Sequence, residues 1–358
     1  KIRLGYFSAD FRKHAVMYLI KGLFELHNKE QFDIYIYSLN SKEDELTDEL
    51  KKNVNVFRNI SDVSDENAVC IARQDSLDIA VDLMGYTKKM RLSVFSLRVA
   101  PIQISYLGYP GSTGADCIDY LIADKVIIPD KFKKFYSEKV IHMPSCYQCN
   151  DTNRKTSKKE FRKTQLGLPE NAFVFACFNA NNKITSNEFD IWISLLKKIK
   201  NSVLWLYKSN NYSAINLKKE SEKRGVESSR IIFAERVSNE DHLSRIKYAD
   251  LFLDTFNYNA HTTASDALWS GVPVITKQGK SFSARVCSSL LTSLSLEELI
   301  VKDNVEYEEK AYSIATNSKY LKDLKYRLNK SRIESPLFDT KRFTENLEKI
   351  YFELVKNL

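Results

Sequence analysis

The sequence lacks the features that mark membrane, secreted and nucleic-acid-binding proteins. No apolar run among its 358 residues reaches the roughly 18 residues of a membrane span, and no signal peptide opens the chain. Lysine and arginine give a net charge of +8, but acidic residues are interspersed among them and no long basic block forms. We therefore expect a cytoplasmic protein that binds neither membranes nor nucleic acid.

Cysteines are few and scattered. The 6 cysteines are too sparse for a secreted disulfide framework. Cys146 and Cys149 form one CxxC, but neither a second such pair nor a nearby histidine pair completes a zinc site. We expect reduced thiols and no bound metal.

Common nucleotide motifs and internal repeats are also absent. No GxGxxG follows a predicted strand and no Walker A motif occurs, which disfavours a dehydrogenase and an NTPase. No repeat of about 30–50 residues is visible, so this chain contains no solenoid. Lys1 lies almost directly on the first predicted strand, and we expect an excised catalytic region with further domains upstream.

Short strand-like and helix-like segments alternate along both halves of the chain. This alternation predicts an α/β fold, with two Rossmann-like domains that each hold a parallel sheet. Ligands of such sheets bind beyond the carboxyl ends of the strands, so we expect the active site in the cleft between two facing domains. The predicted strands are 1–8, 31–39, 77–85, 101–109, 120–124 and 139–143, then 173–179, 202–208, 230–235, 251–256 and 272–277. The predicted helices are 16–28, 42–53, 64–75, 186–200, 213–225, 239–248 and 262–270, with further helices in the last 40 or so residues.

The polar sequence DTNRKTSKKEFRK divides the two halves. We predict an N-terminal domain over 1–150, a linker over 151–165 and a C-terminal domain over 166–335. Residues 336–358 have the amphipathic spacing of a helix, which we expect to pack back toward the N-terminal domain.

The sharpest chemical feature is LFLDTFNYNAHTTASDALWSGVPVIT (251–276), in which a helix begins soon after a strand ends. His261, Thr262 and Thr263 open this helix. Backbone N–H groups at a helix start, beside the positive end of the helix dipole, suit a diphosphate. Asp266 in the first turns could accept hydrogen bonds from ribose hydroxyls. The alternative is that a threonine merely caps the helix.

Two further groups of cationic or imidazole side chains follow predicted strands. Lys183 lies in an Asn-rich loop just after strand 173–179, where a point charge could reach phosphates. His242 and Arg245 are three residues apart and share one helix face, so both could contact a base or phosphate. The alternatives are a solvated lysine and an ordinary surface pair.

The N-terminal half offers a histidine and two strand-exit loops. His14 lies in the loop after the first strand, and Thr87 lies in the loop GYTKKMR. The loop LGYPGSTGAD holds Gly108 and Gly111, which could bring backbone N–H groups close to a substrate. The alternative for this loop is an ordinary connection rich in turns.

Taken together, these segments resemble the catalytic region of the protein O-GlcNAc transferases (glycosyltransferase family 41), most closely the bacterial members. The resemblance runs from Lys1 to about Asn357. It implies a GT-B fold and an inverting, metal-independent enzyme that transfers one GlcNAc from UDP-GlcNAc to Ser or Thr hydroxyls of a protein. Six segments carry it: GYFSADFRKHAV, GYTKKMR, APIQISYLGYPGSTGA, ACFNANNKI, NAHTTASDALWSGVPVIT and SPLFDTKRF.

The resemblance also implies residue roles. The acceptor belongs to the N-terminal domain and the nucleotide sugar to the C-terminal one, with Lys183 neutralising the leaving diphosphate. His14 lies near the reacting centre and is a candidate for the base. The resemblance places the remaining donor-site residues as follows: His261, Thr262 and Thr263 on the diphosphate, Asp266 on the ribose, His242 and Arg245 on the nucleotide, and Asn179, Thr87, Gly108, Pro110 and Gly111 elsewhere in the UDP-sugar site.

The chain departs from the animal enzymes at two positions, and other functions compete. Ala180 stands where they have Gln, and Asn239 where they have Lys near the uracil. The tetratricopeptide repeats that usually select acceptors in this family are not in this chain. The nearest rival is a GDP-fucose-dependent protein O-fucosyltransferase of the SPINDLY type, which lacks the HTTxxDxLW pattern seen here. Another UDP-hexose as donor and a non-catalytic sugar-nucleotide sensor or scaffold are further alternatives.

Overall fold

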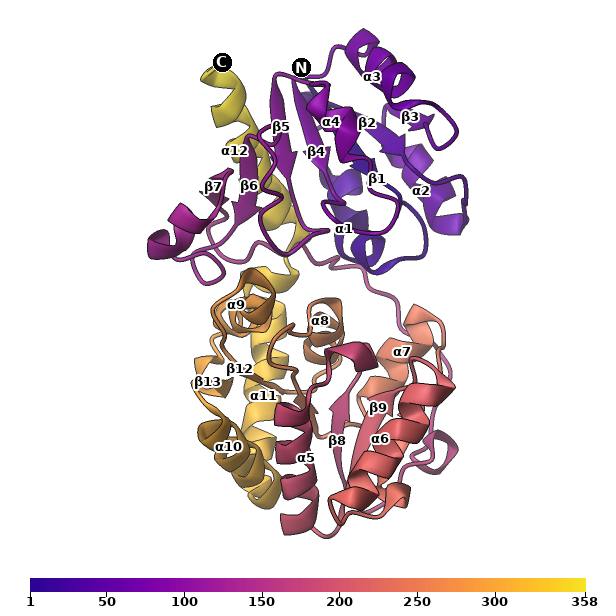
Figure 1. Cartoon of the computed structure of the whole chain (residues 1–358), viewed down its shortest axis with the longest axis vertical. Helices are drawn as coiled ribbons and strands as arrows, with labels where there is room; N and C mark the ends of the chain where they lie inside the picture. The colour runs from indigo at the N-terminus through magenta and orange to yellow at the C-terminus, as the bar shows by residue number, and fades with distance from the viewer. The chain divides into compact units, whose positions relative to one another are not determined.

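The computed structural model describes all 358 residues and divides them into two compact units. Unit 1 comprises Lys1–Asn153 and Pro336–Leu358, and unit 2 comprises Arg154–Ser335. The chain therefore passes from unit 1 into unit 2 and returns for its last segment, as the colours of Figure 1 show.

Unit 1 contains a seven-stranded sheet in the order β3-β2-β1-β4-β5-β6-β7, and every pair of neighbours is parallel. The strand order reverses between β1 and β4, so their exit loops diverge at this point. The strands are β1 (Ile2–Ser8), β2 (Phe32–Ser38), β3 (Val56–Asn59), β4 (Ile79–Asp82), β5 (Ile102–Ser105), β6 (Tyr120–Ala123) and β7 (Lys139–His142).

Five α-helices complete unit 1. Their bounds are α1 (Ala15–Leu26), α2 (Glu45–Asn53), α3 (Asp65–Gln74), α4 (Leu92–Ser96) and α12 (Thr340–Lys356). Stacked Phe7 and Tyr37 rings, 4.3 Å apart at their centroids, lie in the core beneath the helices.

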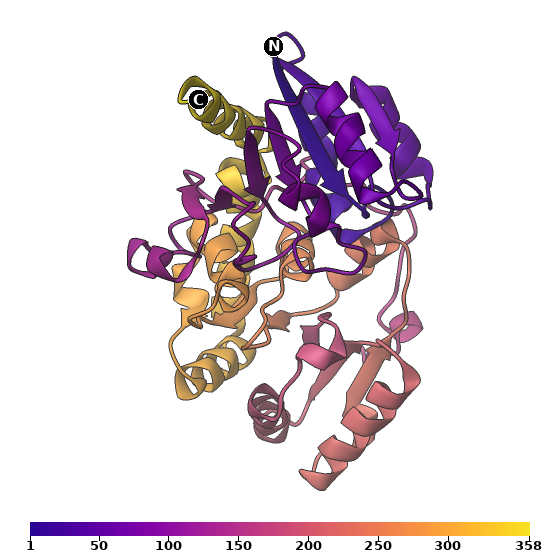
Figure 2. The same cartoon turned by 45° about the horizontal axis from the view of Figure 1, so that its top comes forward.

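Helix α12 is held to unit 1 by polar and aromatic contacts. His27 Nδ1 lies 2.9 Å from Glu348 Oε1, and the hydroxyls of Tyr6 and Tyr351 are 3.4 Å apart. All four side chains are buried, which makes the final helix part of this unit's core. Figures 1 and 2 both show it, in yellow, beside the strands of unit 1.

Unit 2 contains a six-stranded parallel sheet in the order β10-β9-β8-β11-β12-β13. Its order reverses between β8 and β11. The strands are β8 (Phe173–Cys177), β9 (Ser202–Tyr207), β10 (Ile231–Ala234), β11 (Leu251–Leu253), β12 (Val274–Lys277) and β13 (Ile300–Val301). The helices are α5 (Ser186–Lys198), α6 (Asn211–Lys223), α7 (Asn239–Ile246), α8 (Thr262–Trp269), α9 (Val286–Ser293), α10 (Asn304–Thr316) and α11 (Ser318–Glu334).

The prediction of two parallel α/β sheets is confirmed, and the elements it missed have local reasons. Strand β13 has only two residues and helix α4 only five, too few to show a period. Helix α9 reads VCSSLLTS, and its first six residues are all buried, so no polar face marks it as a helix. Helix α10 was also missed, although Asp303 caps it by accepting from Glu306 N.

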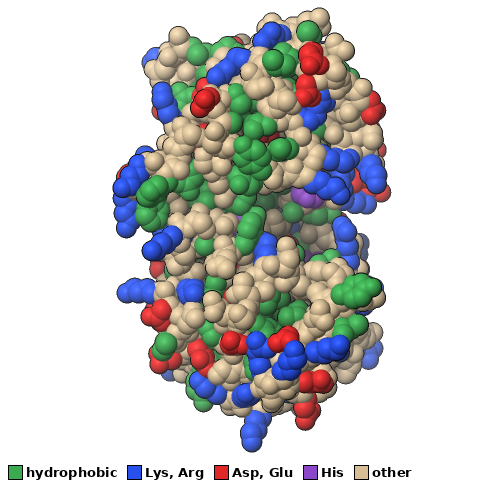
Figure 3. All heavy atoms as spheres, viewed as in Figure 1, with side chains coloured by type: hydrophobic (Ala, Val, Ile, Leu, Met, Phe, Trp, Pro, Cys, Tyr) green, Lys and Arg blue, Asp and Glu red, His purple; other side chains and the backbone are tan.

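Surface charge is mixed. Acidic and basic side chains are interspersed on the face shown in Figure 3. None of the helices combines the length and hydrophobicity needed to cross a bilayer.

Candidate functional site

The polar centre of unit 2 lies where β8 and β11 end, on either side of the reversal in strand order. Asp254 follows β11 directly and is fully buried. Its carboxylate accepts from Ala260 N at 2.6 Å and from the Thr276 hydroxyl at 2.6 Å. Burial raises the pKa of Asp254 to about 7, although these hydrogen bonds act to lower it. The carboxylate thereby fixes the loop that leads into α8.

Asn179 joins the two exit loops. Its Nδ2 donates to Thr255 Oγ1 at 2.7 Å, and its Oδ1 accepts from the Thr263 hydroxyl at 2.5 Å. The side chain is 1% exposed. Asn179 was expected in the UDP-sugar site. Its amide instead forms hydrogen bonds within the protein and fixes the positions of Thr255 and Thr263.

Lys183 lies in the short 3-10 turn after β8 and is largely buried. Its Nζ is 3.3 Å from Asn259 O and 3.8 Å from the centroid of the Tyr258 ring. Burial lowers the pKa of Lys183 to about 8, although Asp254 opposes the shift. The alternative of a solvated surface lysine is wrong: this ammonium is poorly solvated and would gain from an anionic ligand.

Helix α8 begins without a capping side chain. His261 is the N-cap residue and its side chain makes no capping hydrogen bond. The alternative that a threonine merely caps this helix is therefore wrong, because Thr262 and Thr263 are its first two helical residues. The first N–H groups of a helix have no partner within it, so this start can receive an anion.

His261 is neutral in the free protein. Burial and the nearby Lys183 lower its pKa to about 3. Its Nε2 lies 3.3 Å from Ser283 O, and because a carbonyl only accepts, Nε2 carries the proton. The imidazole also stacks on Tyr258 at 4.8 Å. The N–H groups at this helix start are therefore the groups available to hold a phosphate.

Asp266 is engaged by an arginine that the sequence did not single out. Arg154 Nη1 donates to Asp266 Oδ1 at 2.7 Å, and both side chains are almost completely buried. His242 Nε2 lies 3.7 Å from Asp266 Oδ2. Burial raises the pKa of Asp266, and Arg154 opposes that shift. Arg154 lies inside the predicted linker. The polar composition of that segment suggested exposed side chains, whereas Arg154 forms a buried ion pair.

Arg245 is a buried cation, and the charge of Asp241 only partly offsets the effect of burial on its pKa. It is 5% exposed, forms no ion pair, and its Nε has no hydrogen-bond partner. Its guanidinium lies 5.5 Å from the Phe178 ring, and His242 lies 5.0 Å from the same ring. Burial lowers the pKa of Arg245. The alternative of an ordinary surface pair is wrong, and the unsatisfied guanidinium suits a polar or anionic ligand.

In unit 1, the structure brings His14, Thr87 and Gly108 to one pocket of about 390 Å³. His14 is the N-cap of α1, and its Nδ1 is 3.3 Å from Val16 N and 3.4 Å from Asp10 Oδ2. This pocket lies at the exit loops of β1 and β4, where the order of the first sheet reverses.

Position 108 has no room for any side chain. A Cβ at this position would lie 1.7 Å from Leu83 O, so only glycine lets the β5 exit loop pass the β4 exit loop. Pro110 and Gly111 continue the same loop and do not line the pocket. They are the two predicted site residues that the structure leaves outside it in this unit.

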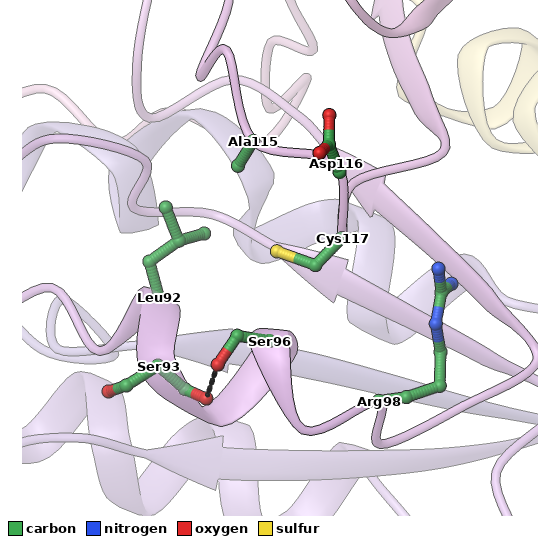
Figure 4. Close-up of a pocket in the computed structure, with 7 residues that line it drawn as sticks. All are labelled: Leu92, Ser93, Ser96, Arg98, Ala115, Asp116 and Cys117. Carbon is green, nitrogen blue, oxygen red and sulfur yellow. Dashed lines mark hydrogen bonds between the residues drawn. The ribbon is translucent and has the colours of Figure 1, made fainter.

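A second hollow in unit 1, about 570 Å³ and shallow, holds none of the predicted residues. Figure 4 shows it between α4 and the segment at Cys117, with the Ser96 hydroxyl bonded to Ser93 O at 2.7 Å. Arg98 at its edge is engaged by Asp119 at 2.6 Å. No group of three or more His, Cys, Asp or Glu side chains could hold a metal ion, and all six cysteines are free.

Sequence reasoning missed Asp254, Tyr258 and Arg154. The string LFLD ends a buried strand with a carboxylate, a signal that could have marked Asp254. Tyr258 and Arg154 carry no such signal, because each matters through a partner that only folding brings near. 

Two parallel α/β units with polar centres at their strand-order reversals form the architecture of GT-B glycosyltransferases. A Thermobaculum terrenum O-GlcNAc transferase mutant superimposes with a TM-score of 0.91 at 28% identity, over 100% of this chain and 68% of that one. Residues 1–164 and 156–347 match the model of glycosyl transferase family 41. The chain belongs to this family.

Curated relatives carry names that fit this family, and they are much longer than this chain. A probable UDP-N-acetylglucosamine–peptide N-acetylglucosaminyltransferase SEC of Arabidopsis thaliana is 37% identical over 99% of this chain, which spans 37% of that protein. A tomato (Solanum lycopersicum) protein named as a probable enzyme of the same activity, SPINDLY, is 30% identical over 97% of this chain and 38% of its own length. 

Proposed function

We propose that this chain is the catalytic region of an inverting, metal-independent glycosyltransferase that moves one GlcNAc from UDP-GlcNAc to Ser or Thr hydroxyls of a protein. The observation that carries the proposal is the desolvated ammonium of Lys183, whose charge acts on His261 at the uncapped start of α8. The names of the Arabidopsis and Thermobaculum relatives support the donor and the acceptor class.

The donor diphosphate would occupy the start of α8 with Lys183. When the bond between the sugar C1 and the β-phosphate oxygen breaks, negative charge grows on UDP. Fixed N–H groups and a poorly solvated ammonium stabilise that charge without reorganising at the moment of reaction. The lowered pKa of Lys183 supports this role, because the free site lacks the negative charge that a diphosphate brings.

The nucleoside would lie beside Arg245 and His242. The unpaired guanidinium of Arg245 can donate to base or ribose oxygens. Asp266 would use its remaining lone pairs to accept from ribose hydroxyls while Arg154 holds its orientation. Asn179 acts on the ligand indirectly, through Thr263.

The acceptor hydroxyl would attack C1 on the face opposite UDP, forming the new C–O bond and inverting the carbon. Its proton must pass to a base, for which we propose Nε2 of His14. In the structure Nδ1 accepts from Val16 N–H, so this role requires that cap bond to be exchanged for an Nδ1–H directed at Asp10 Oδ2, 3.4 Å away, which frees the Nε2 lone pair to accept. UDP then leaves with both electrons of the broken bond.

Ligand-induced thermal shifts test the donor first. The experiment compares UDP, GDP, UDP-GlcNAc and GDP-fucose at equal concentration. We expect a shift with the two uridine ligands and none with the guanosine ligands. Selective stabilisation by GDP and GDP-fucose would instead support protein fucosylation, the alternative from the same fold.

Mass spectrometry of co-expressed candidate proteins then tests transfer. We expect a mass increase of one N-acetylhexosamine on Ser or Thr, strongly reduced when Lys183 is replaced. UDP binding without any transfer or hydrolysis would support a sensor, the alternative from another class.

A further inference from the structure

The pocket around His14 in unit 1 is lined by an excess of positive charge. Arg12, Lys42, Lys88 and Lys89 line it, against one acidic side chain, Asp10. We call this pocket the cationic cup. Its lysines come from the exit loops of β2 and β4, and Arg12 comes from that of β1, so three separate segments supply the charge.

Three of these four cations, Lys42, Lys88 and Lys89, have no counter-ion within the protein. Lys42 and Lys88 form no ion pair, and the ammonium of Lys89 donates to the neutral Asn40 Oδ1 at 2.7 Å. Asp10 lies 3.8 Å from Arg12 and 3.4 Å from His14, so its single charge is shared. The cup is therefore net positive and attracts anions, which low salt strengthens.

The cup is a built feature rather than a group of loose surface lysines. Asn40 Nδ2 donates to Ala9 O at 3.1 Å while its Oδ1 accepts from Lys89, which joins the three loops. Lys89 adopts φ +70, a left-handed backbone that is unfavourable for lysine. Arg12 Nε is buried without a hydrogen-bond partner. A polar group left unsatisfied beside a pocket points to a ligand.

We propose that the cationic cup binds a carboxylate side chain of the acceptor, so that hydroxyls flanked by Asp or Glu are preferred targets. This inference rests on the proposed function, because it takes His14 as the group that meets the acceptor hydroxyl. A peptide backbone is neutral, so a cup with several uncompensated cations gains most from acidic flanks. The donor diphosphate is assigned to unit 2, and the sugar that Thr87 and Gly108 are expected to meet is uncharged, which leaves these cations for the acceptor.

Binding of labelled peptides to the full chain tests the inference, with UDP present at saturation. The probes are a Ser-centred peptide with Glu flanks and its Gln and Lys counterparts, followed by fluorescence anisotropy. We expect the Glu peptide to bind at least tenfold more tightly than the Gln peptide at low salt. Equal affinities for the Glu and Gln peptides would overturn the proposal.

A pair of charge-reversal variants distinguishes binding by the cup from a general effect of net charge. Lys42→Glu/Lys88→Glu should weaken Glu-peptide binding at least tenfold, whereas Lys29→Glu/Lys125→Glu makes the same change in net charge elsewhere on unit 1 and should change it less than twofold. Equal losses in both variants would refute a specific cup. A separate titration starts without UDP. If rising UDP displaces the Glu peptide from the parent, the cup binds the diphosphate and the proposal is refuted.

The same samples distinguish failure of this inference from failure of the proposed function. A thermal shift with UDP reports the donor site in unit 2. If UDP stabilises the parent and both variants equally while the peptides do not discriminate, only the acceptor inference fails. If UDP stabilises none of them, the proposed function fails, whatever the peptides do.

Discussion

Lys183 offers the sharpest test, because its pKa links UDP affinity to pH. With a pKa of about 8, the ammonium is about nine-tenths protonated at pH 7 and about one-tenth at pH 9. A diphosphate placed beside it would restore the pKa toward the ordinary 10.5. UDP binding at pH 9 must then include proton uptake, and we expect affinity about tenfold below that at pH 7. The phosphates of UDP keep constant charge over this range, since their last pKa is near 6.

Isothermal titration of UDP at pH 7, 8 and 9, in buffers of different ionisation enthalpy, measures both affinity and proton uptake. The Lys183→Met variant should bind UDP more weakly and with a clearly shallower pH dependence, because only Asp254, with a pKa of about 7, still titrates beside the site in this range. Lys200→Met, which replaces an exposed lysine, should behave like the parent. A pH dependence as steep in Lys183→Met as in the parent would show that another group, such as Asp254, takes up the proton, and would refute this reasoning.

The same substitution should separate stability from activity. A lysine whose pKa is lower in the folded than in the unfolded chain destabilises the fold below about pH 8, here by up to about 3 kcal/mol. That penalty fades as pH rises from 8 to 10.5. Lys183→Met should therefore unfold at higher urea at pH 7 than the parent, yet transfer sugar on the order of 10²-fold more slowly. Lower stability together with near-parental transfer would contradict both parts.

Three further outcomes are expected. Arg154→Met leaves the buried carboxyl of Asp266 unpaired and should lower the free energy of unfolding by about 3 kcal/mol in urea titrations, while Arg154→Met/Asp266→Asn should recover most of it; equal losses would argue against the pair. Tyr258→Leu removes the ring that stabilises the charged Lys183 ammonium, so the pKa of Lys183 should fall further and UDP affinity should decline at a pH below 8. Tyr258→Phe keeps the ring and should leave the pH of this decline unchanged. Transfer should be unchanged after EDTA treatment, and a strict requirement for a divalent metal would defeat the metal-independent proposal.

Much of the fold was predictable because its strands are short apolar runs that end in polar loops. Residues such as VPVITK and LFLDTF are buried on both faces of a parallel sheet, and their composition shows it without further context. The positions of His261, Lys183 and His14 after strands followed from the same pattern. Elements such as β13 and α9 escaped prediction because neither shows a polar–apolar period.

Local composition and spacing set the two α/β units, the order of their elements and the strand-exit loops that hold most candidate residues, so these could be predicted from the residues alone. Tertiary structure alone decided which polar groups are partnered. It placed Arg154, from a stretch that resembles a linker, on the buried Asp266, set Tyr258 against Lys183, and left Arg245 Nε without a hydrogen-bond partner. Charge pairing depends on distances between segments far apart in the chain, and burial then decides how strongly each charge is felt.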